Sequence, residues 1–168
     1  MDQNLNIDKR YHVKRREVKE ILKRLTTTIR NIDYASFNKN MEAVEINSKG
    51  RVYLINRKPL FIDTETEIFP TLLNQEILTQ LPTLRVDRGA VPHLCNGADL
   101  MAPGIVKMIG EFHVKEIAVV VDEGFSKPIA LVKMLYGSKE MSEKNKGKVA
   151  KNLHYVGDRF WKAFKLIK

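Results

Sequence analysis

The chain has 168 residues and a formal net charge of +9, with 43% apolar and 29% charged residues, which excludes a disordered tail and predicts one domain or two small ones. Its single cysteine, Cys95, excludes a disulfide framework and a cysteine-based structural zinc site. No apolar run reaches the ~18–20 residues of a membrane helix and the amino-terminal segment is polar, so the sequence predicts a soluble, intracellular protein with no membrane attachment.

Positive charge is concentrated at the two ends of the chain. Residues 1–30 hold nine Lys or Arg against four Asp or Glu, and residues 139–168 hold nine against three. Such blocks fit an anionic partner, although solvated faces of lysine-rich helices would give the same pattern.

The first ~80 residues predict an α+β unit. Apolar side chains at helical spacing predict an amphipathic basic helix over residues 12–30; they are Val18, Ile21, Leu22, Leu25 and Ile29. Strands are predicted at 43–46, 51–55, 60–62 and 67–69, followed by a short helix within 71–80.

After Leu81-Pro82, β-strands dominate the prediction. A strand at 84–86 leads into a short helix whose first N–H groups Asp87 can cap, and Gly97 ends that helix in a left-handed conformation. Further strands are predicted at 100–102, 114–121, 128–135 and 148–156, with a short polar helix near 138–146.

Motifs for catalysis are absent from the sequence. The four histidines and Cys95 lack metal-ligand spacing, and no phosphate loop, nucleophile elbow or dinucleotide fingerprint occurs. The acidic run at 63–67 fits a strand edge or loop, and Cys95 fits a small buried apolar residue. The sequence therefore predicts a binding module, not an enzyme, with no cofactor and no metal.

Residues 84–105, LRVDRGAVPHLCNGADLMAPGI, resemble the opening of a PUA domain, the RNA-binding domain of pseudouridine synthases and archaeosine transglycosylases. The matching motifs are Asp87-Arg88-Gly89-Ala90, Asn96-Gly97-Ala98-Asp99-Leu100 and Pro103-Gly104-Ile105. Residues 145–161 are similar to the closing strand of that domain. The resemblance implies a small α+β domain over 1–80 followed by a mostly-β PUA domain, a pseudo-barrel with short helices, over 81–168.

The segment Phe69-Pro70-Thr71-Leu72 and the ending over 145–161 also resemble the malignant T-cell amplified sequence family and the amino-terminal half of ligatin. The resemblance implies an archaeal-type, cytoplasmic translation factor at the small ribosomal subunit, acting in initiation, reinitiation, recycling or tRNA handling. The implied partners are tRNA or small-subunit rRNA and a protein carrying an initiation-factor-like domain. An accessory role in rRNA or tRNA processing or modification, without catalysis of its own, remains the alternative.

The same resemblance implies which residues contact RNA. In PUA domains the first helix, the loop and strand after it, and the last strand form the RNA-facing surface. The implied RNA-binding residues are Arg88, Gly97, Ala98, Asp99, Leu100, Met101, Ala102, Lys148, Lys151 and His154.

Overall fold

The computed structural model describes residues 4–167, and their contacts divide into two compact units. Of the described residues, the first unit contains 4–77 together with 159–167, and the second is Leu78–Asp158. The sequence placed the carboxy-terminal residues in the second domain, whereas in the structure they pack with the first unit.

The first unit is built on a five-stranded antiparallel sheet in the order β1-β2-β3-β4-β5. Its elements are β1 (Ile7–His12), α1 (Arg15–Leu25), the 3₁₀ turn η1 (Ala35–Phe37), β2 (Glu42–Ile46), β3 (Arg51–Ile55), β4 (Lys58–Asp63), β5 (Ile68–Pro70), α2 (Gln75–Leu78) and α5 (Arg159–Phe164). The predicted strands are confirmed, but β1 was missed because four of its six residues are charged or histidine, a composition rare in strands.

Helix α1 begins and ends inside the range that the sequence predicted. The Lys14 N–H donates to Glu17 Oε2 at 3.1 Å, which fixes the first turn. After Leu25 the hydroxyls of Thr26 and Thr27 donate to the carbonyls of Lys23 and Arg24 at 2.6 and 2.8 Å. Threonines that bond back to the last turn favour termination over extension, so the helix ends there.

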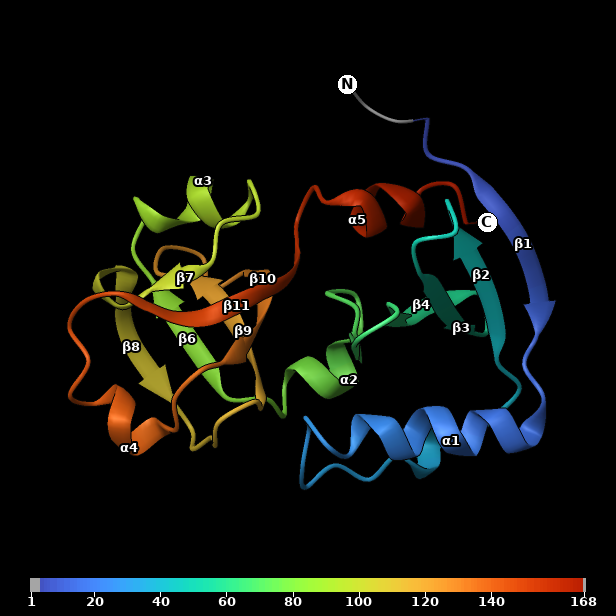
Figure 1. The fold of residues 1–168 in the computed structure, drawn as a ribbon, viewed down its shortest axis with the longest axis horizontal. Coiled ribbons are helices and arrows are strands. Elements are labelled where there is room, and N and C mark those ends of the chain that lie inside the picture. Colours follow the sequence, from blue (N-terminus) through green and yellow to red (C-terminus); the bar gives the residue numbers. More distant parts are fainter. Residues whose placement is uncertain (1–3, 168) are drawn as a thin grey trace. The chain divides into compact units, whose positions relative to one another are not determined.

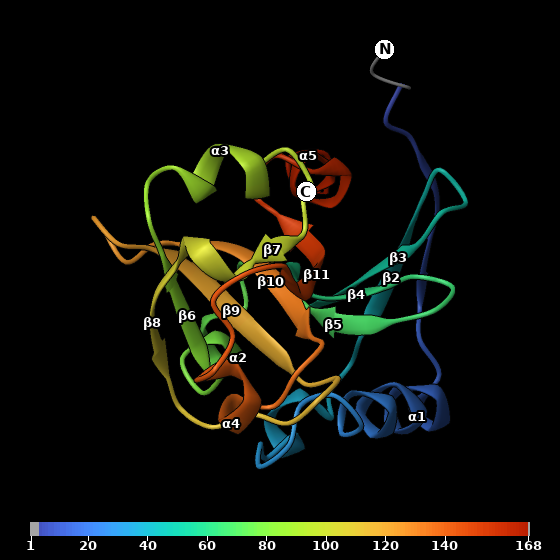
Figure 2. The ribbon, with the colours of Figure 1, turned by 60° about the vertical axis from the view of Figure 1, so that its left-hand side comes forward.

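Helix α5 joins the first unit through an apolar contact with the turn between β2 and β3. Phe160 is 4% exposed, and a Cβ built on Gly50 would lie 2.9 Å from its ring, so only glycine admits the ring at this distance. The Arg159 guanidinium donates to the Lys49 carbonyl at 3.1 Å. Figure 1 and Figure 2 both show α1 and α5 on opposite sides of the strands of this unit.

The second unit is a six-stranded sheet in the order β7-β11-β10-β9-β6-β8, in which only β6 and β9 pair in parallel. Its elements are β6 (Thr83–Val86), α3 (Ala90–Leu94), β7 (Leu100–Met101), the 3₁₀ turn η2 (Ala102–Gly104), β8 (Ile105–Ile109), β9 (Ile117–Asp122), β10 (Pro128–Met134), α4 (Ser138–Met141) and β11 (Lys148–Tyr155). The sequence predicted all of these strands except β8.

The two end strands of this sheet, β7 and β8, are separated along the chain only by the three residues of η2. A sheet whose end strands are joined so tightly must curl until those ends approach, which gives the open barrel that the PUA resemblance implied. Helices α3 and α4 lie at opposite ends of it (Figure 2). None of the helices among residues 4–167 is long and apolar enough to cross a membrane.

Candidate nucleic-acid interface

The loop between α3 and β7 is shaped by its own backbone. Asp87 Oδ1 accepts the Ala90 N–H at 2.9 Å at the start of α3, as the sequence predicted. Gly97 ends the helix at φ +92°, also as predicted, and a Cβ there would lie 3.1 Å from the Tyr155 hydroxyl. Exposed Gly97 and Ala98 therefore present main chain to solvent almost without side chains.

Asn152, in the middle of β11, fastens this loop to the sheet. Its Nδ2 donates to the carbonyls of Leu94 and Ala98 at 3.0 and 2.9 Å, while its backbone N–H donates to Asp99 Oδ1 at 2.8 Å. Three hydrogen bonds from one residue hold both ends of the loop, so its geometry is set before any ligand arrives. Asp99, implied by the resemblance as an RNA contact, thus accepts a backbone N–H of β11 with one carboxylate oxygen.

Cationic and apolar side chains lie beside that loop on β7 and β11. Lys148 pairs across the two strands with Met101, which is 49% exposed. Lys148 Nζ lies 3.3 Å from Asp99 Oδ2, and its side chain keeps 52% of its surface in solvent. Lys151, on the same strand, is also exposed. The structure thus brings Gly97, Ala98, Asp99, Met101 and Lys148 into one surface.

Three of the side chains predicted to contact RNA are buried, and this part of the prediction is corrected. His154 is 0% exposed and its Nδ1 lies 2.7 Å from Asp158 Oδ2. Leu100 and Ala102 are 1% and 7% exposed and belong to the core of the second unit. In this structure none of these three side chains is open to solvent.

A bulge in β11 separates Asn152 from His154. The two residues lie opposite Val132 and Leu131, consecutive residues of β10, so Leu153 is an extra residue in the ladder. Val132 belongs to the core of the second unit and its partner Asn152 faces the same side, whereas His154, opposite Leu131, lies on the other face of the sheet. His154 is buried on that face, where its ring contacts Asp158.

Arg88 lies at the other end of α3 from this surface. It precedes the helix, whereas Gly97 follows it, and its backbone N–H donates to Glu123 Oε1 at 3.3 Å. Its side chain is exposed and available to a phosphate, but no contact connects it with Lys148 or Asp99 among the described residues.

Sequence reasoning missed Asn152 and Tyr155. Asparagine is depleted in strand interiors, so its place inside a predicted strand was the signal that could have singled out Asn152. Tyr155 carried no such signal, because its ring lies beneath Gly97 only after β11 and the loop come together. Cys95 is half-buried rather than fully buried, and burial raises the pKa of its thiol.

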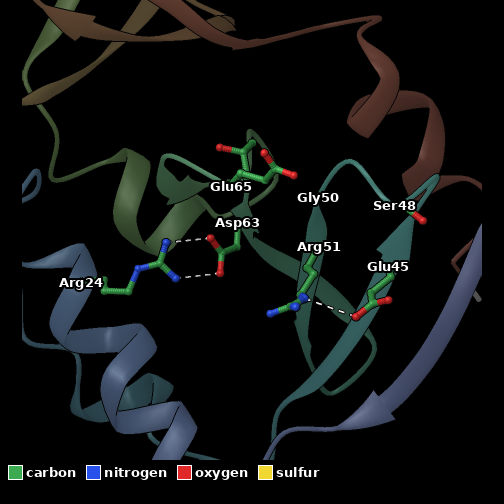
Figure 3. A pocket seen from close by; sticks show the side chains of 8 residues that line it. Arg24, Glu45, Ser48, Gly50, Arg51, Asp63 and Glu65 are labelled. Atoms are coloured by element: carbon green, nitrogen blue, oxygen red, sulfur yellow. Dashed lines mark hydrogen bonds and ion pairs between the residues drawn. The ribbon is translucent and has the colours of Figure 1, made fainter.

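The first unit holds a separate polar cavity of about 490 Å³, shown in Figure 3. Asp63, predicted to lie on a strand edge or loop, is 7% exposed and ends β4. It accepts two hydrogen bonds from the Arg24 guanidinium, both at 2.8 Å, and one from the Tyr53 hydroxyl at 2.9 Å. Arg51 lies 3.4 Å from Glu45 across the same cavity. Each guanidinium group is thus paired with a carboxylate, and Glu65 also lines the cavity, so the charged lining has three carboxylates and two guanidinium groups and does not favour an anion.

Comparisons with known proteins match one family to each part of the chain. A family described as the PUA domain matches residues 82–156, and a domain of unknown function, DUF1947, matches residues 9–74. An uncharacterized protein of Methanocaldococcus jannaschii is 38% identical over 94% of this chain and 98% of its own length. Translation machinery-associated protein 20 of Schizosaccharomyces pombe is 33% identical over 74% of this chain and 73% of its own. The crystal structure of a hypothetical protein from Pyrococcus horikoshii matches with a TM-score of 0.75 and 29% identity, over 93% of this chain and 99% of that one.

Proposed function

This chain belongs to the family of translation machinery-associated protein 20 and the malignant T-cell-amplified sequence proteins, and from that membership we propose that it is an RNA-binding translation factor acting at the small ribosomal subunit. Its role would lie in initiation, reinitiation, recycling or tRNA handling in the cytoplasm, without catalysis of its own. A protein with an initiation-factor-like domain remains a predicted partner.

One observation carries the proposal, namely the fixed loop Gly97–Asp99 beside the lysines of β11. Small residues let an RNA backbone come close to the main chain of this loop. The N–H groups of Gly97 and Ala98 already donate to the carbonyls of Leu94 and His93, so the lysines beside the loop would supply the phosphate contacts. Because Asn152 already holds the loop, little conformational entropy is lost on binding. Exposed Met101 beside Lys148 adds an apolar contact for a base or ribose next to a cation for its phosphate.

The proposed contact can be tested by the salt dependence of RNA binding. Each phosphate neutralised on a single strand adds about −0.7 to the slope of log K against log salt. Lys148→Ala with Lys151→Ala removes two cations, so we expect the slope to become shallower by about 1–2 units. The probe is a fluorescent single-stranded RNA of about 30 nucleotides, titrated at several salt concentrations.

A control variant distinguishes the loss of a specific RNA contact from the general effect of a lower net charge. Lys107→Ala with Lys127→Ala removes two exposed lysines of the same unit that lie outside the predicted surface. It should leave the slope near the wild-type value. If Lys148→Ala/Lys151→Ala also leaves the slope unchanged, RNA binds elsewhere on the chain. Co-sedimentation with archaeal small ribosomal subunits at moderate salt tests the translation role, and absence from the subunit fraction would contradict it.

A further inference from the structure

Helix α1 has three faces of different character, and the proposed function uses none of them. The apolar face packs into the core of the first unit, with Val18, Ile21, Leu22 and Leu25 at 2%, 6%, 8% and 0% exposure. A second face is engaged in polar contacts, since Glu17 accepts the Lys14 N–H and Arg24 binds Asp63. The third face carries four exposed cations, with one exposed carboxylate, Glu20, at its border.

That third face is a stripe of four exposed residues, Arg15, Arg16, Lys19 and Lys23, which we call the α1 stripe. At about 100° per residue, Arg15, Lys19 and Lys23 fall within about 80° of one another around the helix. At 1.5 Å per residue they follow one another along the axis at intervals of about 6 Å.

The cations of the α1 stripe have no carboxylate partner among residues 4–167, in contrast to Arg10, Arg24 and Arg51, which pair with Glu42, Asp63 and Glu45. Packing like charges four residues apart on a helix is itself unfavourable. Glu20, four residues after Arg16 and three before Lys23, offsets part of this cost, and an anionic partner would relieve the remaining repulsion along Arg15, Lys19 and Lys23.

The structure also discriminates between kinds of anionic partner. An amphipathic helix that lies on a membrane needs an apolar face for the lipid, and the apolar face of α1 is already buried in the core. A linear row of cations at regular spacing matches a linear row of phosphates along a nucleic-acid strand, and it offers no apolar anchor of the kind that protein interfaces use at their centre.

We propose that the α1 stripe is a second RNA-binding surface, which holds the phosphate backbone of RNA without reading its sequence. Arginine and lysine side chains on one helical face would bind consecutive phosphates, with no base contact. The inference deepens the proposed function by giving the first unit a direct part in RNA binding, but it stands on the charges of α1 and not on the loop of the second unit.

The test removes three cations of the stripe from the full-length chain, as Arg15→Ala/Lys19→Ala/Lys23→Ala. Alanine has the highest helix propensity, so α1 should persist, and circular dichroism with a thermal melt checks this. Three lost phosphate contacts should make the log–log salt slope shallower by about 2 units on the single-stranded RNA used above. Binding to RNAs of different sequence and equal length should fall by the same factor.

The same variant is also measured in the Lys148→Ala/Lys151→Ala background. A further loss of about 2 units there shows a surface independent of the second unit. A loss with the α1 variant but none with the lysine pair of β11 would leave the α1 stripe standing and overturn the site proposed on the second unit. No loss with the α1 variant in either background would overturn the stripe alone.

A control variant that loses the same number of positive charges tests whether net charge alone changes the salt slope. Lys39→Ala/Lys58→Ala/Lys165→Ala removes three exposed lysines dispersed over the first unit. If this control lowers the slope as much as the α1 variant does, the stripe is not a site. If a polyglutamate peptide loses affinity for the α1 variant while the RNA slope stays unchanged, the partner is an acidic protein and the RNA proposal is wrong.

Discussion

Replacing Gly97 with alanine should destabilise the protein, because two separate features of the candidate interface oppose a side chain there. Its φ of +92° is a conformation that residues with a Cβ adopt reluctantly. In addition, a Cβ would lie 3.1 Å from the Tyr155 hydroxyl oxygen and 3.4 Å from two carbons of the same ring. The variant Gly97→Ala therefore tests both the backbone and the packing of the loop.

A second glycine of the same unit separates these two contributions. Gly147 has a φ of +85°, and a Cβ there would have nothing within 4 Å. Left-handed backbone costs an alanine about 1–2 kcal/mol, partly offset by about 0.4–1 kcal/mol from the stiffer unfolded chain, so Gly147→Ala should destabilise by about 0.5–1 kcal/mol. The contact with Tyr155 adds an overpacking cost of about 1–2 kcal/mol, which brings Gly97→Ala to about 1.5–3 kcal/mol.

Urea unfolding measures the difference in unfolding free energy between the two variants. The probe is the NMR signals of β9 and β10, because the fluorescence of the only tryptophan, Trp161, reports on the first unit. Adding Tyr155→Phe to Gly97→Ala removes the nearest contact and should recover part of the excess loss; a double-mutant cycle isolates that part. Equal losses of free energy for Gly97→Ala and Gly147→Ala would refute the argument that Tyr155 packs beneath the loop.

Two further predictions concern the same unit. Asn152→Ala removes two donated hydrogen bonds at about 1 kcal/mol each, so the free energy of unfolding should fall by about 2 kcal/mol. Lys148→Ala removes only an exposed ion pair with Asp99 and should lower it by less than about 0.5 kcal/mol. Similar losses of unfolding free energy for the two variants would contradict the role given to Asn152. The N–H groups of Phe125 and Lys127 hold the pKa of Asp122 below its ordinary value of 3.8, so its stabilising contribution is complete above that value and is lost as the pH falls through the lower pKa of the folded state. Urea midpoints between about pH 2 and 6 should show this loss in the wild type and a flatter profile for Asp122→Asn; parallel profiles would contradict it.

The sequence predicted the elements whose pattern is local. The apolar spacing of α1, the turn between β2 and β3 and the left-handed Gly97 each depend on a few neighbouring residues, and the structure has all three. β1 could not be found this way, because it is an edge strand defined by its pairing with β2 and not by apolar alternation.

The residues of the candidate interface also fall into those that a local motif predicted and those that strand pairing decides. Motif residues at the loop were predicted from their resemblance to PUA domains, and Gly97, Ala98 and Asp99 do lie on one exposed loop. Which residues of β11 face that loop depends on the pairing of β11 with its neighbouring strands. The resemblance alone implied His154 as a contact, whereas the structure buries its side chain and holds the loop through Asn152.

The same reasoning changes what the net charge of +9 means for partners. A formal charge counts every lysine and arginine equally, but Arg10 and Arg24 hold the first unit together through Glu42 and Asp63, and Lys148 shares its charge with Asp99. The cations that remain without a carboxylate on α1 are fewer but lie in a row. Since counterion release depends on the phosphates actually contacted, the salt slope should follow these rows and not the total charge. Removing three dispersed lysines and removing three from one helix face leave identical net charges, so only the arrangement in the fold can make their salt slopes differ.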